Sequence, residues 1–350
     1  MFWNLSIKGY LYDKNHAFFP LLPFLISSIR SFISIFSPTI AEPLTLIICI
    51  FIGNCVFVLS VLVFYKLSLI VLEIESYAYR ATVLYIFNPA AVYFTVVYNE
   101  SYFALFSLLG MYLCHTSKDF TRIIWGSLCF AMATSCRSNG AYLLLFCAWS
   151  TLKLMFTPLK LSNFLKGIIT GLTCLTIVAS TFFAFTIYIG YTLYCKNTEQ
   201  IPEWCNAKLP NMYSFIQEKY WQVGFLKTWI SNERVFRSAM WFSIPYNLLA
   251  VISVIQVLRK YSLQMIIPYV VYFVFLVLTV ALIANAEINT RVCASAPVVY
   301  WVYGRWQVET DEKTSNRGIK EYIKKYIYVV YVTIYFIAEI LLVPTFIGWI

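Results

Sequence analysis

Apolar segments of spanning or near-spanning length run along the whole chain, separated by short polar stretches. They cover residues 18–36, 44–64, 81–97, 101–114, 122–136, 141–156, 167–194, 238–258, 263–284, 292–304 and 326–348. A bilayer-crossing helix needs about 20 apolar residues, so the short runs at 101–114, 122–136 and 292–304 predict half-spans or helices packed inside a bundle. The runs are continuous rather than alternating, which is typical of helices. We therefore expect an all-α polytopic membrane protein with about eight to ten helices, forming a single domain over residues 1–350.

The basic residues of the connections predict which side of the membrane each one faces. Lysine and arginine gather in Lys153–Lys166, in Arg259 and Lys260, and in Arg305–Lys325. Cytoplasmic loops are enriched in these residues, so residues 305–325 are expected to form a cytoplasmic loop. The long loop at residues 194–237 and the segment Asn285–Arg291 then fall on the opposite side.

The composition supports a membrane protein and limits the kinds of partner that we expect. The chain has 61% apolar and 12% charged residues, a mean hydropathy of +0.73 and a net charge of +10. A soluble domain would carry about twice that share of charge. Cytoplasmic loops account for most of the basic excess. A basic rim for a phosphate-bearing lipid is the alternative, and charge alone does not decide between them. We expect no nucleic-acid partner.

The cysteines and histidines predict neither a metal centre nor a bound cofactor. Most of the ten cysteines lie inside apolar runs, where they act as small core residues. Only Cys195 and Cys205 share a polar loop, and they could form a disulfide. The two histidines, His16 and His115, stand far apart in the sequence and complete no ligand cluster.

Two polar islands interrupt the apolar pattern, at Tyr98–Ser101 and Cys136–Gly140. A carboxylate and a guanidinium beside membrane segments are costly, and such groups usually face a cavity where they have a function. If the runs at 101–114 and 122–136 form a hairpin with a cytoplasmic turn, Glu100 and Arg137 share the opposite side. The plainer alternatives are a helix-capping acid and an arginine that reaches to the membrane surface.

Several short stretches carry a family resemblance, in order and across nearly the whole chain. They are Gly9–Tyr12 with Ala17–Pro20, Asn88–Ala90 leading into Tyr98–Ser101, Arg137–Gly140, Trp204 with Cys205, Tyr213–Gln217 with Tyr220–Phe225, and Thr290 with Arg291 before Ala296–Pro297 and Tyr300–Trp301. On these stretches the chain resembles PIG-V, the GPI mannosyltransferase family that adds the second mannose.

The resemblance implies a GT-C fold, which is a bundle of many helices with its active site at the luminal membrane surface. It implies an enzyme of the endoplasmic reticulum membrane that transfers mannose from dolichol-phosphate mannose, through an α-1,6 link, to the lipid-linked GPI precursor. Membrane lipids surround such an enzyme, and the family resemblance leaves room for a small membrane partner subunit.

One departure concerns the beginning of the chain. The family opens with a membrane helix and a luminal Trp-Asp pair, whereas this sequence starts Met1-Phe-Trp-Asn. An amide such as that of Asn4 cannot serve as a base. The resemblance therefore implies that the first helix and its acid are missing through truncation, and that this chain alone does not restore transfer.

Inverting glycosyl transfer needs a carboxylate to take the proton of the acceptor hydroxyl. Glu100 and Asp13 are the candidate catalytic acids, because Asp119 and Asp311 fall in stretches predicted to be cytoplasmic. The alternative for Asp13 is a solvated residue on an interfacial helix. Arg137 and Arg291 suit the donor phosphate.

Aromatic and amide side chains near these residues suit contacts with sugar rings. The candidates for acceptor or sugar binding are Tyr98, Asn99, Asn139, Trp204, Tyr213, Gln217, Tyr220 and Trp221. Interfacial aromatic belts use the same residue types. Two other hypotheses stay open: an inactive relative of the family, and a membrane transporter with a Glu100–Arg137 pair. Asn99-Glu-Ser is also a glycosylation sequon, which we expect to be unmodified so close to the membrane.

Overall fold

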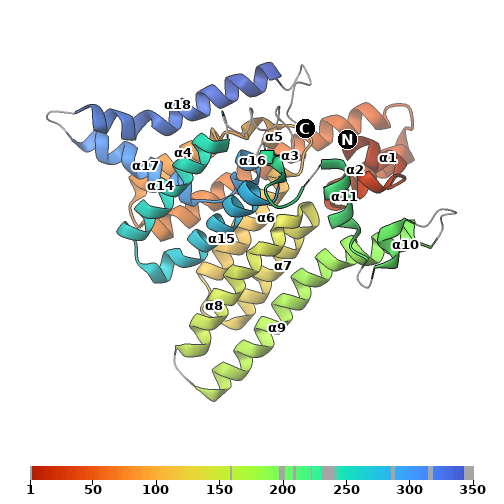
Figure 1. The fold of residues 1–350 in the computed structure, drawn as a ribbon, viewed down its shortest axis with the longest axis horizontal. Helices are drawn as coiled ribbons and strands as arrows, with labels where there is room; N and C mark the ends of the chain where they lie inside the picture. The colour runs from red at the N-terminus through yellow and green to blue at the C-terminus, as the bar shows by residue number, and fades with distance from the viewer. Residues whose placement is uncertain are drawn as a thin grey trace. The chain divides into compact units, whose positions relative to one another are not determined.

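The computed structural model consists of helices joined by turns, with no strand in the part of the chain that it describes (Figure 1). Among the described residues, three apolar helical segments are long enough to cross a membrane: Ala41–Leu72 (α3), Leu161–Tyr194 and Leu263–Leu282 (α15). The prediction of an all-α membrane protein is confirmed. The described residues are 2–157, 160–196, 202–207, 210–221, 223–230, 241, 243–284, 288–313 and 318–342.

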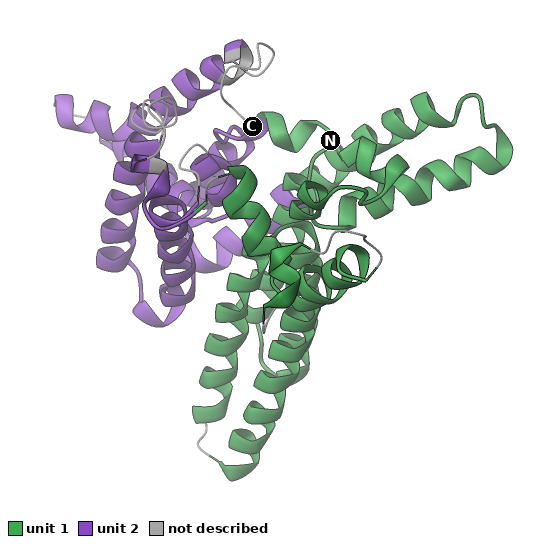
Figure 2. Ribbon diagram, turned by 45° about the vertical axis from the view of Figure 1, so that its right-hand side comes forward, with its two compact units in different colours: residues 1–59, 92–223 green, residues 60–91, 224–350 purple. Residues whose placement is uncertain are grey.

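The chain divides into two compact units (Figure 2). Unit 1 comprises residues 1–59 and 92–223, and unit 2 comprises residues 60–91 and 224–350. Helix α3 contributes its first part to unit 1 and its last part to unit 2. The expectation of one domain over the whole chain stays a prediction.

A group of packed helices forms the centre of unit 1. Helices α6 (Glu100–His115) and α7 (Phe120–Cys136) make an antiparallel hairpin, and α8 (Leu144–Phe156) and α9 (Leu161–Phe183) pack against α7 (Figure 1). Helix α7 starts where the carboxylate of Asp119 accepts a hydrogen bond from the backbone N–H of Arg122 at 2.9 Å. The hairpin expected from the two short apolar runs is confirmed.

Besides the first part of α3, unit 1 contains shorter helices from the two ends of its sequence. The N-terminal segment holds α1 (Phe2–Lys8), the 3-10 turn η1 (Asp13–Ala17) and α2 (Leu21–Phe36). Helix α9 continues through a π-helical segment, η3 (Ala184–Ile189), into α10 (Gly190–Tyr194). The loop expected at residues 194–237 contains further short helices, namely η4 (Glu203–Asn206), α11 (Met212–Trp221) and α12 (Lys227–Ile230), of which α12 belongs to unit 2. Part of that loop, including residues 231–237, lies outside the described residues.

Unit 2 is built around the buried helix α17 (Val298–Glu312). Helix α4 (Glu75–Ile86) packs closely along it, and the indole N–H of Trp301 donates to the hydroxyl of Ser68 at 2.8 Å. Besides α12 and the last part of α3, the described residues of unit 2 also form α14 (Ile244–Lys260), α15, α16 (Asn289–Cys293) and α18 (Ile319–Leu342).

The boundaries of the expected cytoplasmic loop at residues 305–325 are wrong. Helix α17 continues to Glu312 and α18 begins at Ile319, so only residues 313–318 connect them. The sequence misleads here because Arg305 is charged and yet only 3% exposed. Its guanidinium lies over the ring of Tyr261, 5.7 Å from the centroid, and its Nε is 3.4 Å from the Glu309 carboxylate one turn further on. The side of the membrane on which this connection lies stays a prediction.

We expect Gly304→Ala to destabilise unit 2. A Cβ at this position would lie 2.6 Å from the backbone nitrogen of Ala81 and 2.8 Å from its Cα. Backbone atoms cannot rotate away, so α4 and α17 must separate, and overpacking of this kind costs about 1–3 kcal/mol. Melting curves of the detergent-solubilised protein should show a lower midpoint. Gly53→Ala is the control, because no atom lies within 4 Å of its Cβ position; equal midpoints for the two variants would contradict the expectation.

Candidate active site

A buried ion pair joins the two polar islands in unit 1. Arg137 Nη1 lies 2.9 Å from Glu100 Oε1, and the two side chains are 17% and 2% exposed. Glu100 is the first residue of α6 and Arg137 directly follows α7, so the hairpin brings them together at its open end. The ring of Phe103 lies 5.8 Å from the guanidinium carbon. The N-terminus of α6 and the guanidinium of Arg137 both place positive charge beside the Glu100 carboxylate.

Besides the ion pair, a hydrogen bond joins the two islands, and a second one fixes the first island to the segment before it. The amide of Asn99 donates to the carbonyl of Cys136 at 2.8 Å, and the hydroxyl of Ser101 donates to the carbonyl of Phe94 at 2.6 Å. After Arg137 the chain turns back over α7, and a Cβ at Gly140 would lie 2.6 Å from the Cα of Thr134. Only glycine allows this approach, so the second island has a fixed backbone position.

Each island also presents a buried amide atom that has no hydrogen-bond partner within the described part of the chain. These atoms are Oδ1 of Asn99, an acceptor, and Nδ2 of Asn139, a donor. Buried polar groups are normally hydrogen-bonded, and an exception needs an explanation. Beside an ion pair, an unused acceptor and an unused donor can serve the hydroxyl groups of a polar ligand.

Helix α11 connects the second island to the N-terminal segment. Near its start, the hydroxyl of Tyr213 lies 2.7 Å from that of Ser138. Near its end, Tyr220 donates to Asp13 Oδ1 at 2.8 Å, and Lys219 Nζ lies 3.6 Å from Asp13 Oδ2. The hydrogen bond to Asp13 raises the pKa of Tyr220. The two tyrosines are two helical turns apart, so they lie on one face of α11.

His16 is a buried centre of contacts that the sequence did not reveal. Its Nε2–H donates to the carbonyl of Phe185 at 2.7 Å, within the π-helical segment η3, and its ring stacks on that of Phe185 with centroids 4.1 Å apart. Burial lowers the pKa of His16, so the ring is neutral at pH 7. Nearby, the hydroxyl of Tyr194 donates to the carbonyl of Tyr10 at 2.7 Å. These contacts hold the N-terminal segment against the end of the long apolar helix.

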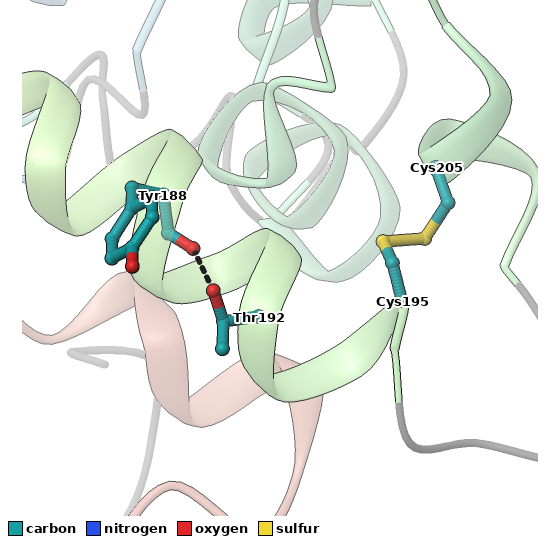
Figure 3. Close-up of a disulfide and its surroundings, with 4 residues drawn as sticks. All are labelled: Tyr188, Thr192, Cys195 and Cys205. Carbon is teal, nitrogen blue, oxygen red and sulfur yellow. Dashed lines mark hydrogen bonds between the residues drawn. A yellow bond between two sulfur atoms is a disulfide. The ribbon is translucent and has the colours of Figure 1, made fainter.

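A disulfide joins Cys195, just after α10, to Cys205 in η4, with 5.9 Å between the Cα atoms. Figure 3 shows the pair beside the last turns of the helix, where the hydroxyl of Thr192 donates to the carbonyl of Tyr188 at 2.8 Å. The sequence had left this pairing open, and the structure forms it. The bond borders a small apolar cluster of Tyr194, Trp204, Met212 and Ile216.

The other candidate residues have mixed surroundings. The ring of Tyr98 packs edge-on against Phe2 at 5.0 Å, and Trp221 packs in the same way against Phe18 at 6.2 Å. Gln217 accepts a backbone hydrogen bond at its carbonyl. Trp204 is 7% exposed, in the cluster beside the disulfide. Arg291 lies in α16 of unit 2, so its proximity to the ion pair stays a prediction.

Sequence reasoning missed four residues of this region: His16, Ser138, Phe103 and Lys219. Ser138 stands inside the second island, so its position in the sequence was a signal, whereas nothing local marked Phe103 or a buried role for His16. No group of three or more His, Cys, Asp or Glu side chains among the described residues is placed to hold a metal ion.

Comparison with known proteins places the whole chain in one family. The family model described as Mannosyltransferase (PIG-V) matches residues 1–266 and 256–350. No solved structure matches the chain.

Three relatives illustrate the similarity. A protein of Schizosaccharomyces pombe named GPI mannosyltransferase 2 is 26% identical over 314 residues, which cover 86% of this chain and 62% of the relative. One of Cricetulus griseus named GPI alpha-1,6-mannosyltransferase 2 is 26% identical over 352 residues, covering 86% of this chain and 70% of the relative. One of Homo sapiens with the same name is 28% identical over 258 residues, covering 65% and 50%. The chain thus spans less than two thirds of the yeast and human relatives that it matches.

Proposed function

Because the chain belongs to the PIG-V mannosyltransferase family, we propose that it transfers mannose to the GPI-anchor precursor, the activity named for its relatives. In detail, we propose transfer of the second mannose, through an α-1,6 link, from dolichol-phosphate mannose at the luminal face of the endoplasmic reticulum membrane. The observation that carries the proposal is the Glu100–Arg137 ion pair, which is buried between two polar islands.

Arg137 is suited to bind the phosphate that leaves when mannose is transferred. A guanidinium has five N–H donors in a planar fork that matches a phosphate. Glu100 bonds to its Nη1, and the Arg137 side chain is 17% exposed, so part of it is accessible to a ligand. We assign to Glu100 the task of holding the guanidinium in place, which makes it part of the catalytic charge arrangement.

Asp13 is suited to take the proton of the acceptor hydroxyl. Its carboxylate is 26% exposed, against 2% for Glu100, so an acceptor can approach it from solvent. Tyr220 and Lys219 hold it in position. Helix α11 separates the contacts of Tyr213 and Tyr220 by about 10 Å along its axis, and we place the transferred sugar between the phosphate side and the acceptor side. Asn99 and Asn139 then offer their unused amide atoms to sugar hydroxyls.

Depleting the protein in the cells that normally express it tests the proposed function. A GPI precursor that carries one mannose should accumulate, and GPI-anchored proteins should be lost from the surface. Restoring expression of the gene from its own genomic locus should reverse both the accumulation of the precursor and the loss of surface proteins. If depletion changes neither the precursors nor the uptake of solutes, the chain is an inactive relative. If the precursors are unchanged and the uptake of a solute falls, the transporter hypothesis is favoured.

Arg137→Lys, introduced at the same locus, should impair transfer by about tenfold or more. An ammonium keeps the charge but cannot form the two parallel bonds that a guanidinium gives to a phosphate, and one charged hydrogen bond is worth about 1.5–3 kcal/mol. The ratio of one-mannose to two-mannose precursor, divided by the amount of folded protein, is the measurement. Arg122→Lys, at the exposed start of α7, the helix that Arg137 follows, is the matched control. Equal ratios in the two variants would assign Arg137 a purely structural role.

A further inference from the structure

A second glycosylation sequon lies at the start of the chain, in Asn4-Leu5-Ser6. We propose that Asn4 is an N-glycosylation site, modified on the side of the membrane where the disulfide forms. The inference does not depend on the proposed enzymatic activity. It rests on the exposure of Asn4 and on the contacts that connect α1 to the disulfide.

The two sequons of the chain differ in their surroundings. Helix α1 buries Phe2 and Leu5, at 3% and 4% exposure, and presents Asn4 on its exposed face. This spacing is that of an amphipathic helix with Asn4 on the outward side. Asn99 is only 4% exposed, and its amide nitrogen donates to the carbonyl of Cys136. The fold therefore leaves Asn4 accessible for a glycan, whereas the amide nitrogen of Asn99, to which a glycan would be attached, is already hydrogen-bonded to Cys136.

The disulfide identifies the side of the membrane on which α1 lies. Structural disulfides form in oxidising compartments such as the lumen of the secretory pathway, and Cys195 is bonded to Cys205. The residue before Cys195, Tyr194, donates its hydroxyl to the carbonyls of Tyr10 and Tyr12, at 2.7 and 3.0 Å.

The N-terminal segment therefore lies beside the disulfide. Asn4 is six residues from Tyr10, and a membrane crossing needs about 20 apolar residues. No crossing fits between them, so Asn4 is on the side of the disulfide. N-glycans are attached in that same lumen, so the Asn4 sequon lies in the compartment where N-glycosylation takes place.

The modification requires one co-substrate, an oligosaccharide linked to a polyprenyl diphosphate, and the oligosaccharide transferase of the cell. The amide nitrogen of Asn4 bonds to the anomeric carbon of the first sugar. The bond from that carbon to the diphosphate oxygen breaks, and the polyprenyl diphosphate leaves with the electron pair. The amide proton passes to a base of the transferase, so the charges balance.

The test uses the protein tagged at its own genomic locus. Digestion with an endoglycosidase that removes N-glycans should increase its electrophoretic mobility by one step. Asn4→Gln and Ser6→Ala should abolish the shift, Ser6→Thr should preserve it, and Asn99→Gln should leave it unchanged. An unshifted wild-type protein, or a shift that disappears in Asn99→Gln and persists in Asn4→Gln, would overturn the proposal.

A further variant separates two ways in which the proposal could be wrong. Glu199→Thr creates an additional sequon at Asn197, between the two disulfide cysteines in the sequence. We expect this variant to carry one glycan more than the wild type. If it carries one while Asn4 carries none, Asn4 is on the correct side and is not recognised. If neither is modified, the assignment of the side is wrong. Both results overturn a glycan at Asn4.

Discussion

Glu100→Gln should lower mannosyl transfer by about 100-fold or more. The substitution keeps the size and polarity of the side chain and removes its charge. Arg137 then loses the carboxylate that lies 2.9 Å from its Nη1, in a place where Glu100 is only 2% exposed. A guanidinium without a charged partner is free to rotate out of the position that the leaving phosphate requires. Pairs buried to this degree also matter for folding, so transfer must be compared at equal amounts of folded protein.

The matched control for this prediction is Glu42→Gln. Glu42 also pairs with an arginine of unit 1, Arg30, but at 3.4 Å and with 58% and 33% of the two side chains exposed. Exposed pairs contribute about 0–1 kcal/mol, so this variant should transfer mannose at nearly the normal rate. The measurement is the rate of formation of the two-mannose precursor in microsomes. Equal rates for the two variants would mean that Glu100 has no role in transfer.

Gly140→Ala should reduce both the amount of folded protein and its activity. The added Cβ would lie 2.6 Å from the Cα and the nitrogen of Thr134 and 2.9 Å from the carbonyl carbon of Ala133. These are backbone atoms of α7, so the segment after Arg137 must move away from the helix, at a cost of about 1–3 kcal/mol. A displacement of about 1 Å at a catalytic group can cost 100-fold in rate. We therefore expect the activity per folded molecule to fall as well.

Gly171→Ala provides the comparison for this second variant. Gly171 lies in α9, and no atom lies within 4 Å of its Cβ position. Alanine in a helix is favoured over glycine, so this change should be neutral or slightly stabilising. Size-exclusion profiles of the detergent-solubilised proteins and transfer per folded molecule are the two measurements. A Gly140→Ala protein with normal values of both would show that the turn after Arg137 has room to adjust.

The parts of the site that could be predicted from the sequence are those formed by residues close to one another in the sequence. Apolar runs of the right length gave the α6–α7 hairpin, and the polar islands at its open end placed Glu100 and Arg137 together. The hydrogen bond from Tyr220 to Asp13 joins residues 207 positions apart, and the one between Ser138 and Tyr213 joins residues 75 positions apart. Contacts between residues so far apart in the sequence depend on how the helices pack, and no local sequence pattern predicts them.

The burial of polar side chains was the second kind of information that the sequence did not contain. Arg305 has the appearance of a loop residue, because arginines usually lie in water. In the fold it is covered by its neighbours and supported by the ring of Tyr261. His16 is a similar case, since a histidine inside an aromatic cluster has the same sequence signature as a solvated one.

The π-helical segment at Ala184–Ile189 sets the rotational phase of everything that follows it in the helix. Each residue of an α-helix advances by about 100°, and a π-type turn takes in one extra residue. Tyr194 and Cys195 therefore point in a different direction from the one that an uninterrupted α-helix would give them. Removing one residue from this segment would leave a regular helix of nearly the same length. It would also turn Tyr194 away from Tyr10 and Cys195 away from Cys205. The extra residue in this turn therefore gives both side chains the orientation that the hydrogen bond and the disulfide require.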